Sequence, residues 1–332
     1  CSACRSGSSQ GAPDRAPRSV RRFRVTVRVM VAAVAYTGAM PGPLQFAIPS
    51  ALDYFATLVA EDESLSLVEA AASIAQDAQP QLDVQSVLAE IDALGAKLCR
   101  RVPADAVPLQ RLRLLNRYFF HELGFAGNVN DYYDPRNSYL HLVLSSRRGI
   151  PITLAVLYIE FAQQIGLRAR GVSFPGHFLV KLRLNQGQKQ GEVLIDPFNG
   201  RSLSREDLAE MLEPYRQRHG LADEDEMPLG LFLQSASARD VVARMLRNLK
   251  EIHRGNEDWA PLLAVQERLV VLLPQDWEEQ RDRGLTYAEL GRTEEAAQDL
   301  ATYLEHRPQA QDRRALVDRL AELRRATPPR LH

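Results

Sequence analysis

The stretch "GIPITLAVLYIEFAQQIGLRARGVSFPGHFLVKL", residues 149–182, predicts a helix that is followed by a strand. Its first half is apolar on almost every side, and a helix with that pattern is normally buried at the centre of a domain. Gly166 marks the expected end of this helix, because glycine is common just after a helix C-terminus. The stretch therefore predicts a buried helix that leads directly into a sheet.

Two strands are predicted after this helix, at residues 170–184 and 191–198. The polar sequence "NQGQKQ" between them predicts a turn, and strands joined by a short turn pair in antiparallel fashion. Before the helix, residues 44–127 show the apolar spacing that is typical of amphipathic helices. We predict an α+β domain over residues 40–222, with a helical lead-in and a small antiparallel sheet.

Composition argues against several classes of function. The 332 residues are 45% hydrophobic, which suits about two globular domains, and the formal net charge is -1. A nearly neutral chain has no general attraction for nucleic acid or for an anionic membrane surface. No segment after residue 40 has the roughly 18 apolar residues that a membrane-spanning helix needs. We therefore expect no nucleic-acid partner and no membrane partner.

The cysteines favour a reducing compartment. Three cysteines in a chain of 332 residues cannot build a dense disulfide framework, so we expect a cytoplasmic protein. Cys1 and Cys4 form one C-x-x-C pair, but a zinc site needs two further ligands and none lies nearby in the sequence. The sequence therefore predicts no metal and no other cofactor.

Residues 1–39 differ from the rest of the chain. Residues 1–24 are rich in Ser, Gly, Pro and Arg, which predicts disorder. Residues 25–40, "VTVRVMVAAVAYTGAM", resemble the apolar region of a signal peptide, but Arg28 interrupts them and the chain has no initiating methionine. The other interpretation, which we favour, is a disordered or non-native extension over residues 1–39, with the folded protein starting near Met40.

The C-terminal part has the spacing of tetratricopeptide repeats, which are pairs of closely packed helices. The residues that carry one unit are Gly284, Tyr287, Ala296, Leu300 and Pro308. Pro274 precedes Pro308 by one full repeat period of about 34 residues. The acidic run at residues 222–228 predicts a boundary. We predict an all-α repeat region over residues 228–325, with two units and a capping helix, which leans on the first domain because so few units are rarely stable alone.

A histidine and an aspartate are expected to meet across the two predicted strands. The length of the turn decides which residues face each other, and the hydrophobic pattern favours a turn of four residues. That register pairs Phe178 with Ile195, Val180 with Val193, Lys181 with Glu192, and His177 with Asp196. Cross-strand Cβ atoms lie about 5 Å apart, so the carboxylate would orient the imidazole as in a nucleophile–base–orienter triad. The alternative is a structural histidine beside a turn carboxylate.

Four segments in order resemble a transglutaminase-like domain of the papain-type superfamily. They are "YYDPRNSYL" (132–140), "RRGIPITLAVLY" (147–158), "FPGHFLVK" (174–181) and "IDPFNGRSLS" (195–204). The chain is especially similar to the SirB-type invasion-regulator family, which joins such a domain to tetratricopeptide repeats, and the resemblance extends from about residue 40 to the C-terminus. It implies a transglutaminase-like core, a repeat region and a link to gene expression or virulence.

The resemblance also implies which residues form the site. In transglutaminase-like enzymes the central helix starts with G-x-C, an alanine follows four residues after the cysteine, and a catalytic histidine and aspartate lie on the next strands. Gly149, Ala155, His177 and Asp196 match these positions, but the cysteine is replaced by Pro151. A cysteine there would gain a lowered pKa from the helix dipole and the imidazolium, whereas proline has no nucleophile and suits a first helical turn.

Other residues are weak substitutes for the missing nucleophile. Thr153 points about 200° around the helix from position 151, and threonine nucleophiles usually rely on a nearby free amine. Cys99 is expected to be a small core residue of a separate helix. The remaining candidates are expected to line a binding cleft rather than to react: Asn137, Tyr139, Gly149, Pro151, Thr153 and Gly176.

These observations leave three functional hypotheses. The leading one is a non-catalytic protein that binds a protein or peptide partner through the former active-site cleft and the repeats, as an adaptor or regulator. The second is a cysteine-independent amide hydrolase or acyl-transfer enzyme that uses His177 and Asp196. The third is a structural polar network that includes this pair together with Asn137 and Tyr139.

Overall fold

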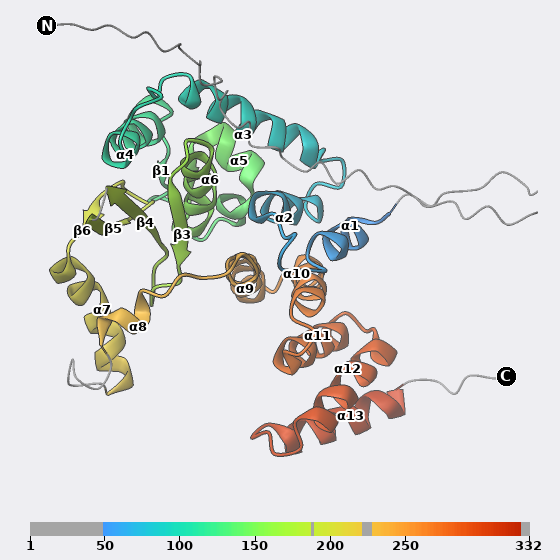
Figure 1. Cartoon of the computed structure of the whole chain (residues 1–332). Coiled ribbons are helices and arrows are strands. Elements are labelled where there is room, and N and C mark those ends of the chain that lie inside the picture. Colours follow the sequence, from blue (N-terminus) through green and yellow to red (C-terminus); the bar gives the residue numbers. More distant parts are fainter. Residues whose placement is uncertain (1–48, 187–188, 221–227, 327–332) are drawn as a thin grey trace, which may run out of the picture. The chain divides into compact units, whose positions relative to one another are not determined.

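The computed structural model describes residues 49–186, 189–220 and 228–326 (Figure 1). The extension predicted at residues 1–39 and most of the boundary predicted at 222–228 lie outside the described residues. Within the described part, no helix combines the length and the apolar character of a membrane span. The architecture is α+β, as the sequence predicts: helices surround one small antiparallel sheet, and a run of helices follows.

The lead-in is helical. Its elements are α1 (Ala51–Leu58), α2 (Leu67–Ser73), η1 (Ile74–Gln76), α3 (Val84–Cys99), α4 (Pro108–Asn116) and the π-helical turn η2 (Arg117–Glu122). Local sequence explains where these helices begin. Ser50 and Asp53 form a reciprocal capping box at α1, and the Asp83 side chain accepts a hydrogen bond from the backbone of Gln85 at α3. Pro108 starts α4, where a missing N–H costs nothing.

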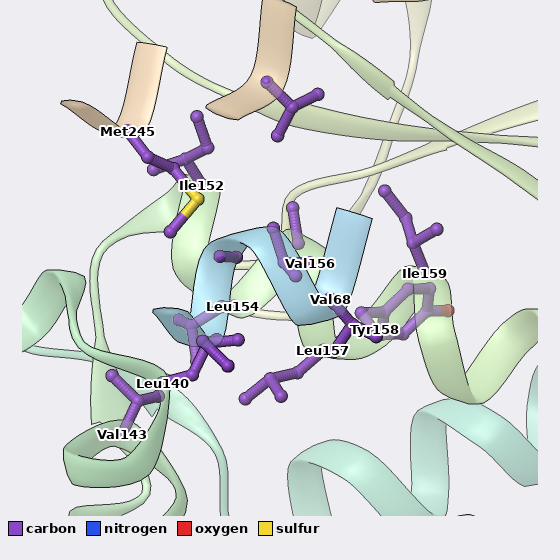
Figure 2. Packing of buried hydrophobic residues seen from close by; sticks show 14 of the residues in the cluster. Val68, Leu140, Val143, Ile152, Leu154, Val156, Leu157, Tyr158, Ile159 and Met245 are labelled. Carbon is purple, nitrogen blue, oxygen red and sulfur yellow. The ribbon is translucent and has the colours of Figure 1, made fainter. Parts of the chain in front are cut away.

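The predicted buried helix is α6 (Pro151–Gln164), and it is the centre of the core. Pro151 is its first residue, and Gly166 follows its end with a left-handed φ of 78°. Figure 2 shows its side chains packed among those of α2, α5 (Leu140–Ser146) and α9 (Ala238–Gly255). The labelled members of this cluster are Val68, Leu140, Val143, Ile152, Leu154, Val156, Leu157, Tyr158, Ile159 and Met245. The prediction of a central apolar helix is confirmed.

The sheet has four antiparallel strands in sequence order. They are β3 (Arg168–Val172), β4 (Leu179–Gln186), β5 (Lys189–Ile195) and β6 (Ser202–Leu203). The predicted strand at 170–184 is therefore wrong in one respect, because residues 173–178 leave the sheet and divide it into β3 and β4. The sequence "SFPGH" in this segment contains Pro and Gly, which interrupt strands. A separate two-residue parallel pair joins β1 (Ala126–Gly127) to β2 (Arg148–Gly149).

The predicted strand register is also wrong. Val180 pairs with Ile195 rather than with Val193, and Glu192 lies opposite Arg183 rather than Lys181. β4 continues to Gln186 and β5 begins at Lys189, and these two residues pair, so the register differs by two residues from the predicted one. Because side chains alternate with a period of two, such a shift leaves every side chain on the same face, and hydrophobic patterning does not distinguish the two registers.

The C-terminal helices form the predicted repeats. The first domain also contains η3 (Pro135–Ser138), which precedes α5, and the sheet is followed by α7 (Arg205–His219) and α8 (Leu229–Phe232). The chain then continues through α9, α10 (Trp259–Leu272), α11 (Trp277–Glu289), α12 (Thr293–His306) and α13 (Arg313–Ala326). Gly284 explains the close approach of α11 and α12, because a Cβ at this position would lie 3.0 Å from Cβ of Asp299. Leu300 and Tyr303 of α12 belong to a separate apolar cluster with residues of α13.

The repeat helices contact the lead-in directly. Arg268 of α10, which is fully buried, donates a hydrogen bond of 2.8 Å to the carboxylate of Asp77. Arg239 of α9 donates to the carboxylate of Asp62 and to the carbonyl oxygen of Val59, each over 2.6 Å. These contacts are consistent with the expectation that so short an array leans on the preceding helices.

Candidate functional site

The candidate site begins at a turn. The sequence predicted His177 on a strand, and this is wrong. The residue lies in the turn at 173–178 that precedes β4. Its backbone N–H donates to the carbonyl oxygen of Phe174 over 3.1 Å. Gly176 has a φ of +69°, a conformation that favours glycine, and no atom lies within 4 Å of where its Cβ would be. The turn thus places His177 at the end of the sheet where β4 begins.

His177 and Asp196 are in contact. Nε2 of His177 lies 2.8 Å from Oδ1 of Asp196, which directly follows β5. The same Oδ1 accepts a bond of 2.9 Å from the backbone N–H of Phe198, and Oδ2 accepts one of 2.8 Å from Nδ2 of Asn199. The carboxylate is therefore held on both oxygens. The pair forms beyond the last rungs of the β4–β5 ladder, which is why the error in register does not separate it.

The pairing decides what the imidazole can do. A carboxylate only accepts hydrogen bonds, so Nε2 carries the proton in the neutral ring and Nδ1 carries the lone pair. The His177 side chain is 20% exposed, whereas that of Asp196 is 8% exposed. The arrangement presents an oriented imidazole whose Nδ1 can accept a proton or a hydrogen bond from a bound molecule.

The start of α6 contains no nucleophile. Pro151 is buried at the first position of this helix. Thr153 is fully buried, and its Oγ1 has no hydrogen-bond partner within the described part of the chain. The hydroxyl is therefore out of reach of a surface-bound molecule. Position 151 remains, as the resemblance implies, the place where a transglutaminase-like enzyme would carry its cysteine.

Two further candidates are buried rather than exposed to solvent. Asn137 is buried; its Oδ1 accepts from Nδ2 of Asn128, and its own Nδ2 donates to the carbonyl oxygens of Asp131 and Tyr132. Tyr139 is also buried, and burial, with a smaller contribution from the negative charge of Asp77, raises its pKa to about 12. Asn137 thereby shapes the loop at 128–137.

Gly149 has a steric role. It belongs to β2, and a Cβ at this position would lie 3.1 Å from the side chain of Val143 and 3.5 Å from the carbonyl oxygen of Asn137. A side chain at position 149 would therefore crowd Val143 of α5.

A chain of aromatic rings leads away from the histidine, from the half-buried Phe198 to the exposed Tyr132 and Tyr133. The ring centroid of Phe198 lies 6.4 Å from that of His177 and 6.1 Å from that of Tyr132, and Tyr132 lies 5.3 Å from Tyr133. Tyr133 is 77% exposed. We call Tyr132, Tyr133 and Phe198 the aromatic rim. None of the three was predicted as a site residue, although the density of tyrosines in the loop "NVNDYYDPRNSYL" was a signal for them.

Arg244 of α9 was also missed. It donates hydrogen bonds to Ser173, Phe174 and His177. Burial lowers its pKa, and the nearby Tyr132 phenol opposes that shift. No sequence signal pointed to it, because it lies far along the chain on a helix that packs against the repeats.

The prediction for Cys99 is wrong. The residue is exposed at the C-terminal end of α3, and its thiol lies 3.4 Å from the carbonyl oxygen of Gln164. Desolvation raises its pKa, so it is a poor nucleophile. Gln164 ends α6 and Pro151 begins it, which separates Cys99 from the candidate site by about 20 Å at 1.5 Å per residue.

Two open hollows lie away from this site. One, of about 810 Å³, is lined by residues of α1 and of the α10–α11 connection, with Arg239 and Arg307. The other, of about 860 Å³, is lined by residues of α11, of α12 and of the connection that follows it. Neither contains His177, Asp196 or Pro151. Among the described residues, no group of three or more His, Cys, Asp or Glu side chains is arranged to hold a metal ion.

Comparisons with known proteins agree with the two-part organisation. The family profile described as transglutaminase-like superfamily matches residues 85–247, and the profile described as tetratricopeptide repeat matches residues 249–321. A UPF0162 protein of Xylella fastidiosa is 38% identical over 249 residues, which cover 75% of this chain and 86% of that protein. A UPF0162 protein of Pseudomonas aeruginosa is 29% identical over 274 residues, or 81% and 95% of the two chains.

One more distant similarity concerns a shorter segment. F-box only protein 21 of Homo sapiens is 32% identical over 142 residues, which cover 36% of this chain and 23% of that protein. No solved structure matches the chain significantly.

Proposed function

Because the chain belongs to the family of UPF0162 proteins and joins a transglutaminase-like domain to tetratricopeptide repeats, we propose that it is a non-catalytic adaptor or regulator that binds a protein or peptide. One observation carries the proposal. His177 and Asp196 are hydrogen-bonded, while Pro151 occupies the position of the nucleophile. A site with an oriented base and no nucleophile keeps its capacity to bind and loses the covalent step of acyl transfer.

The aromatic rim supports binding at this site. Tyr132 and Tyr133 are exposed, and large rigid rings supply contact area at a low cost in side-chain entropy. Asn137 holds the backbone of the loop that carries them, so the rings are presented on an ordered loop. A peptide that covers the rim would bring a hydrogen-bond donor to Nδ1 of His177.

The repeats support a second contact surface. The hollow of about 860 Å³ contains side chains of both charges together with an aromatic ring, a mixture suited to a peptide. Its charged and aromatic lining residues are Glu278, Arg281, Tyr303, His306, Arg307 and Asp312. Tetratricopeptide repeats usually bind proteins, and this surface gives the chain a second means of holding a partner.

The proposal also concerns the family of regulators, the compartment and the cofactors of the protein. We assign the chain to the SirB-type regulators, in the cytoplasm and without a metal or other cofactor, on the basis of the four sequence motifs and the cysteine content. The role of regulator follows from that resemblance.

A catalytic alternative is favoured by one observation. Nε2 of His177 is bound to Asp196, which leaves Nδ1 as a base that could activate water for amide hydrolysis. In that case the wild-type protein should hydrolyse amide or ester substrates, and His177→Ala should abolish the activity.

Binding is tested with a defined peptide. A ligand is selected from a random peptide library on the full chain, and its Kd is measured by fluorescence anisotropy. We expect Tyr133→Ser and His177→Ala each to weaken binding about tenfold or more, because central aromatic contacts often contribute 2 kcal/mol. Leu109→Ser, which changes an exposed apolar residue of α4, is the matched control and should leave the Kd unchanged.

Three results would contradict the proposal. Turnover that disappears in His177→Ala would establish the catalytic alternative. A ligand whose Kd is insensitive to both Tyr133→Ser and His177→Ala would place binding elsewhere. A fall in melting temperature in both His177→Ala and Asp196→Asn, with unchanged Kd, would establish a purely structural pair.

A further inference from the structure

The position of His177 needs an explanation, because no strand holds it. β4 starts at Leu179, and β3 ends at Val172, so the six residues between them lie outside the ladder. The positive φ of Gly176 also belongs to this segment. A turn outside a sheet has few bonds of its own, and an imidazole carried on it would sample several orientations unless another group fixed the backbone.

Arg244 supplies that group. Its Nη1 donates to Oγ of Ser173 over 2.6 Å and to the carbonyl oxygen of Phe174 over 3.2 Å, while Nη2 donates to the carbonyl oxygen of His177 over 2.8 Å. The guanidinium also lies 5.6 Å from the ring centroid of Phe178. One planar cation thus bonds to both ends of the turn, a geometry that a single ammonium group does not reproduce.

The helix that carries Arg244 is anchored on the repeat side. One turn later, Arg247 donates to the carboxylates of Asp276 and Glu279, each over 2.7 Å. After another turn, Lys250 donates to the carboxylate of Asp282 over 2.6 Å. Successive basic residues of α9 therefore contact the His177 turn and α11, and of these three only Arg244 bonds to the turn.

We propose that Arg244 is the positioning residue of the candidate site, and that it keeps the Nε2 proton of His177 directed at Asp196. It acts on the backbone and does not touch a bound molecule. The inference goes beyond the proposed function, because it concerns how the imidazole is held and stands whether the site binds or catalyses.

The test is a spectroscopic signature of the His177 ring. The full chain is labelled with 15N-histidine, and the seven histidines are resolved by NMR, with His177→Gln to assign the signal. In the wild type we expect a single tautomer with a slowly exchanging Nε2 proton. Arg244→Ala should give a mixture of tautomers and make that proton exchange about tenfold faster or more, the effect of losing a hydrogen bond of ordinary strength. Arg244→Lys should give an intermediate result.

Arg247→Ala is the matched control. It removes an arginine of the same helix, with two carboxylate contacts, and should lower the melting temperature while leaving the His177 signals unchanged. The proposal is overturned if Arg244→Ala keeps the wild-type tautomer and exchange rate, or if Arg247→Ala alters them equally. If Arg244→Ala does not fold, Arg244→Lys provides the test. A wild-type His177 signal in Arg244→Lys would show that the planar guanidinium is not needed, and would overturn the proposal.

Discussion

The transglutaminase-like core and the repeat region are stabilised in different ways. Eleven of the fourteen residues of α6 are buried, and Thr153 is the only non-aromatic polar residue among them. In the repeat region the interior includes ion pairs: Lys250 donates to Glu279 over 2.5 Å, and Arg283 donates to Asp299 over 2.7 Å. A stack of helix pairs has less apolar surface to bury than a central helix with neighbours on all sides. The core should therefore be sensitive to cavities, and the repeats to charge.

The largest expected effect is a cavity in the core. Phe161 is fully buried in α6, with its ring centroid 5.9 Å from that of Phe119. Phe161→Ala should lower the free energy of unfolding by about 3–5 kcal/mol, because the lost contacts and the cavity both contribute. Guanidinium denaturation measures this loss. Gln163→Ala, on the exposed side of the same helix, should change it by no more than about 0.5 kcal/mol. Equal effects would mean that α6 is not the centre of the core.

A smaller effect is expected from breaking a buried ion pair. Lys250 and Glu279 are only 7% and 5% exposed at their side chains. Lys250→Met leaves the carboxylates of Glu279 and Asp282 without this cation, and should cost about 3 kcal/mol in the free energy of unfolding. The measurement is again chemical denaturation, followed by the helical circular dichroism signal.

Its control is an exposed pair of the same region. Arg307 and Glu278 are both 46% exposed, so Arg307→Gln should cost less than about 1 kcal/mol, and the cost should shrink further in high salt. If Lys250→Met were neutral, the interior pairs would not stabilise the repeats, and the contrast with the core would fail.

The smallest effect is a dependence on pH. Burial lowers the pKa of His141 in α5 and of His253 in α9 below the usual 6.5, and Asp258 opposes the shift at His253. The folded state therefore holds both rings neutral while the unfolded chain binds protons below pH 6.5. Stability is fully present above that pH and should fall as the pH decreases, by at most about 1.4 kcal/mol per pH unit for each group.

Two substitutions distinguish the contribution of His141 in the core from that of His253 in α9 to the pH dependence of stability. His141→Phe should reduce the loss of melting temperature between pH 7.5 and pH 5.5, and His253→Phe should reduce it less, because Asp258 lies 3.7 Å from Nδ1 and partly compensates the charge. An unchanged pH dependence in His141→Phe would show that burial of this ring does not oppose its protonation.

Much of the fold could be predicted from local patterns. The apolar run of α6 dictates a buried helix, and the glycine, tyrosine and proline spacing around Gly284 dictates a repeat hairpin. The contact of His177 with Asp196 could also be anticipated, although the register used to predict it was wrong. Both residues lie just beyond the paired strands, so their contact does not depend on the register of the ladder.

The sequence by itself determined the class of the protein, the central helix, the repeats and the absence of a cysteine at position 151. Each of these depends on residues close together in the chain, or on a periodicity that survives without knowledge of the packing.

Only the tertiary structure decided what surrounds the histidine. Asn137 bonds to the backbone of the loop that carries Tyr132 and Tyr133, and Arg244 meets the His177 turn because α9 packs against α2 and α6. Cys99 lies exposed at the end of α3, where its thiol contacts the carbonyl oxygen of Gln164. These contacts join residues that are distant in the chain, and no periodicity encodes them, since they depend on how complete elements pack.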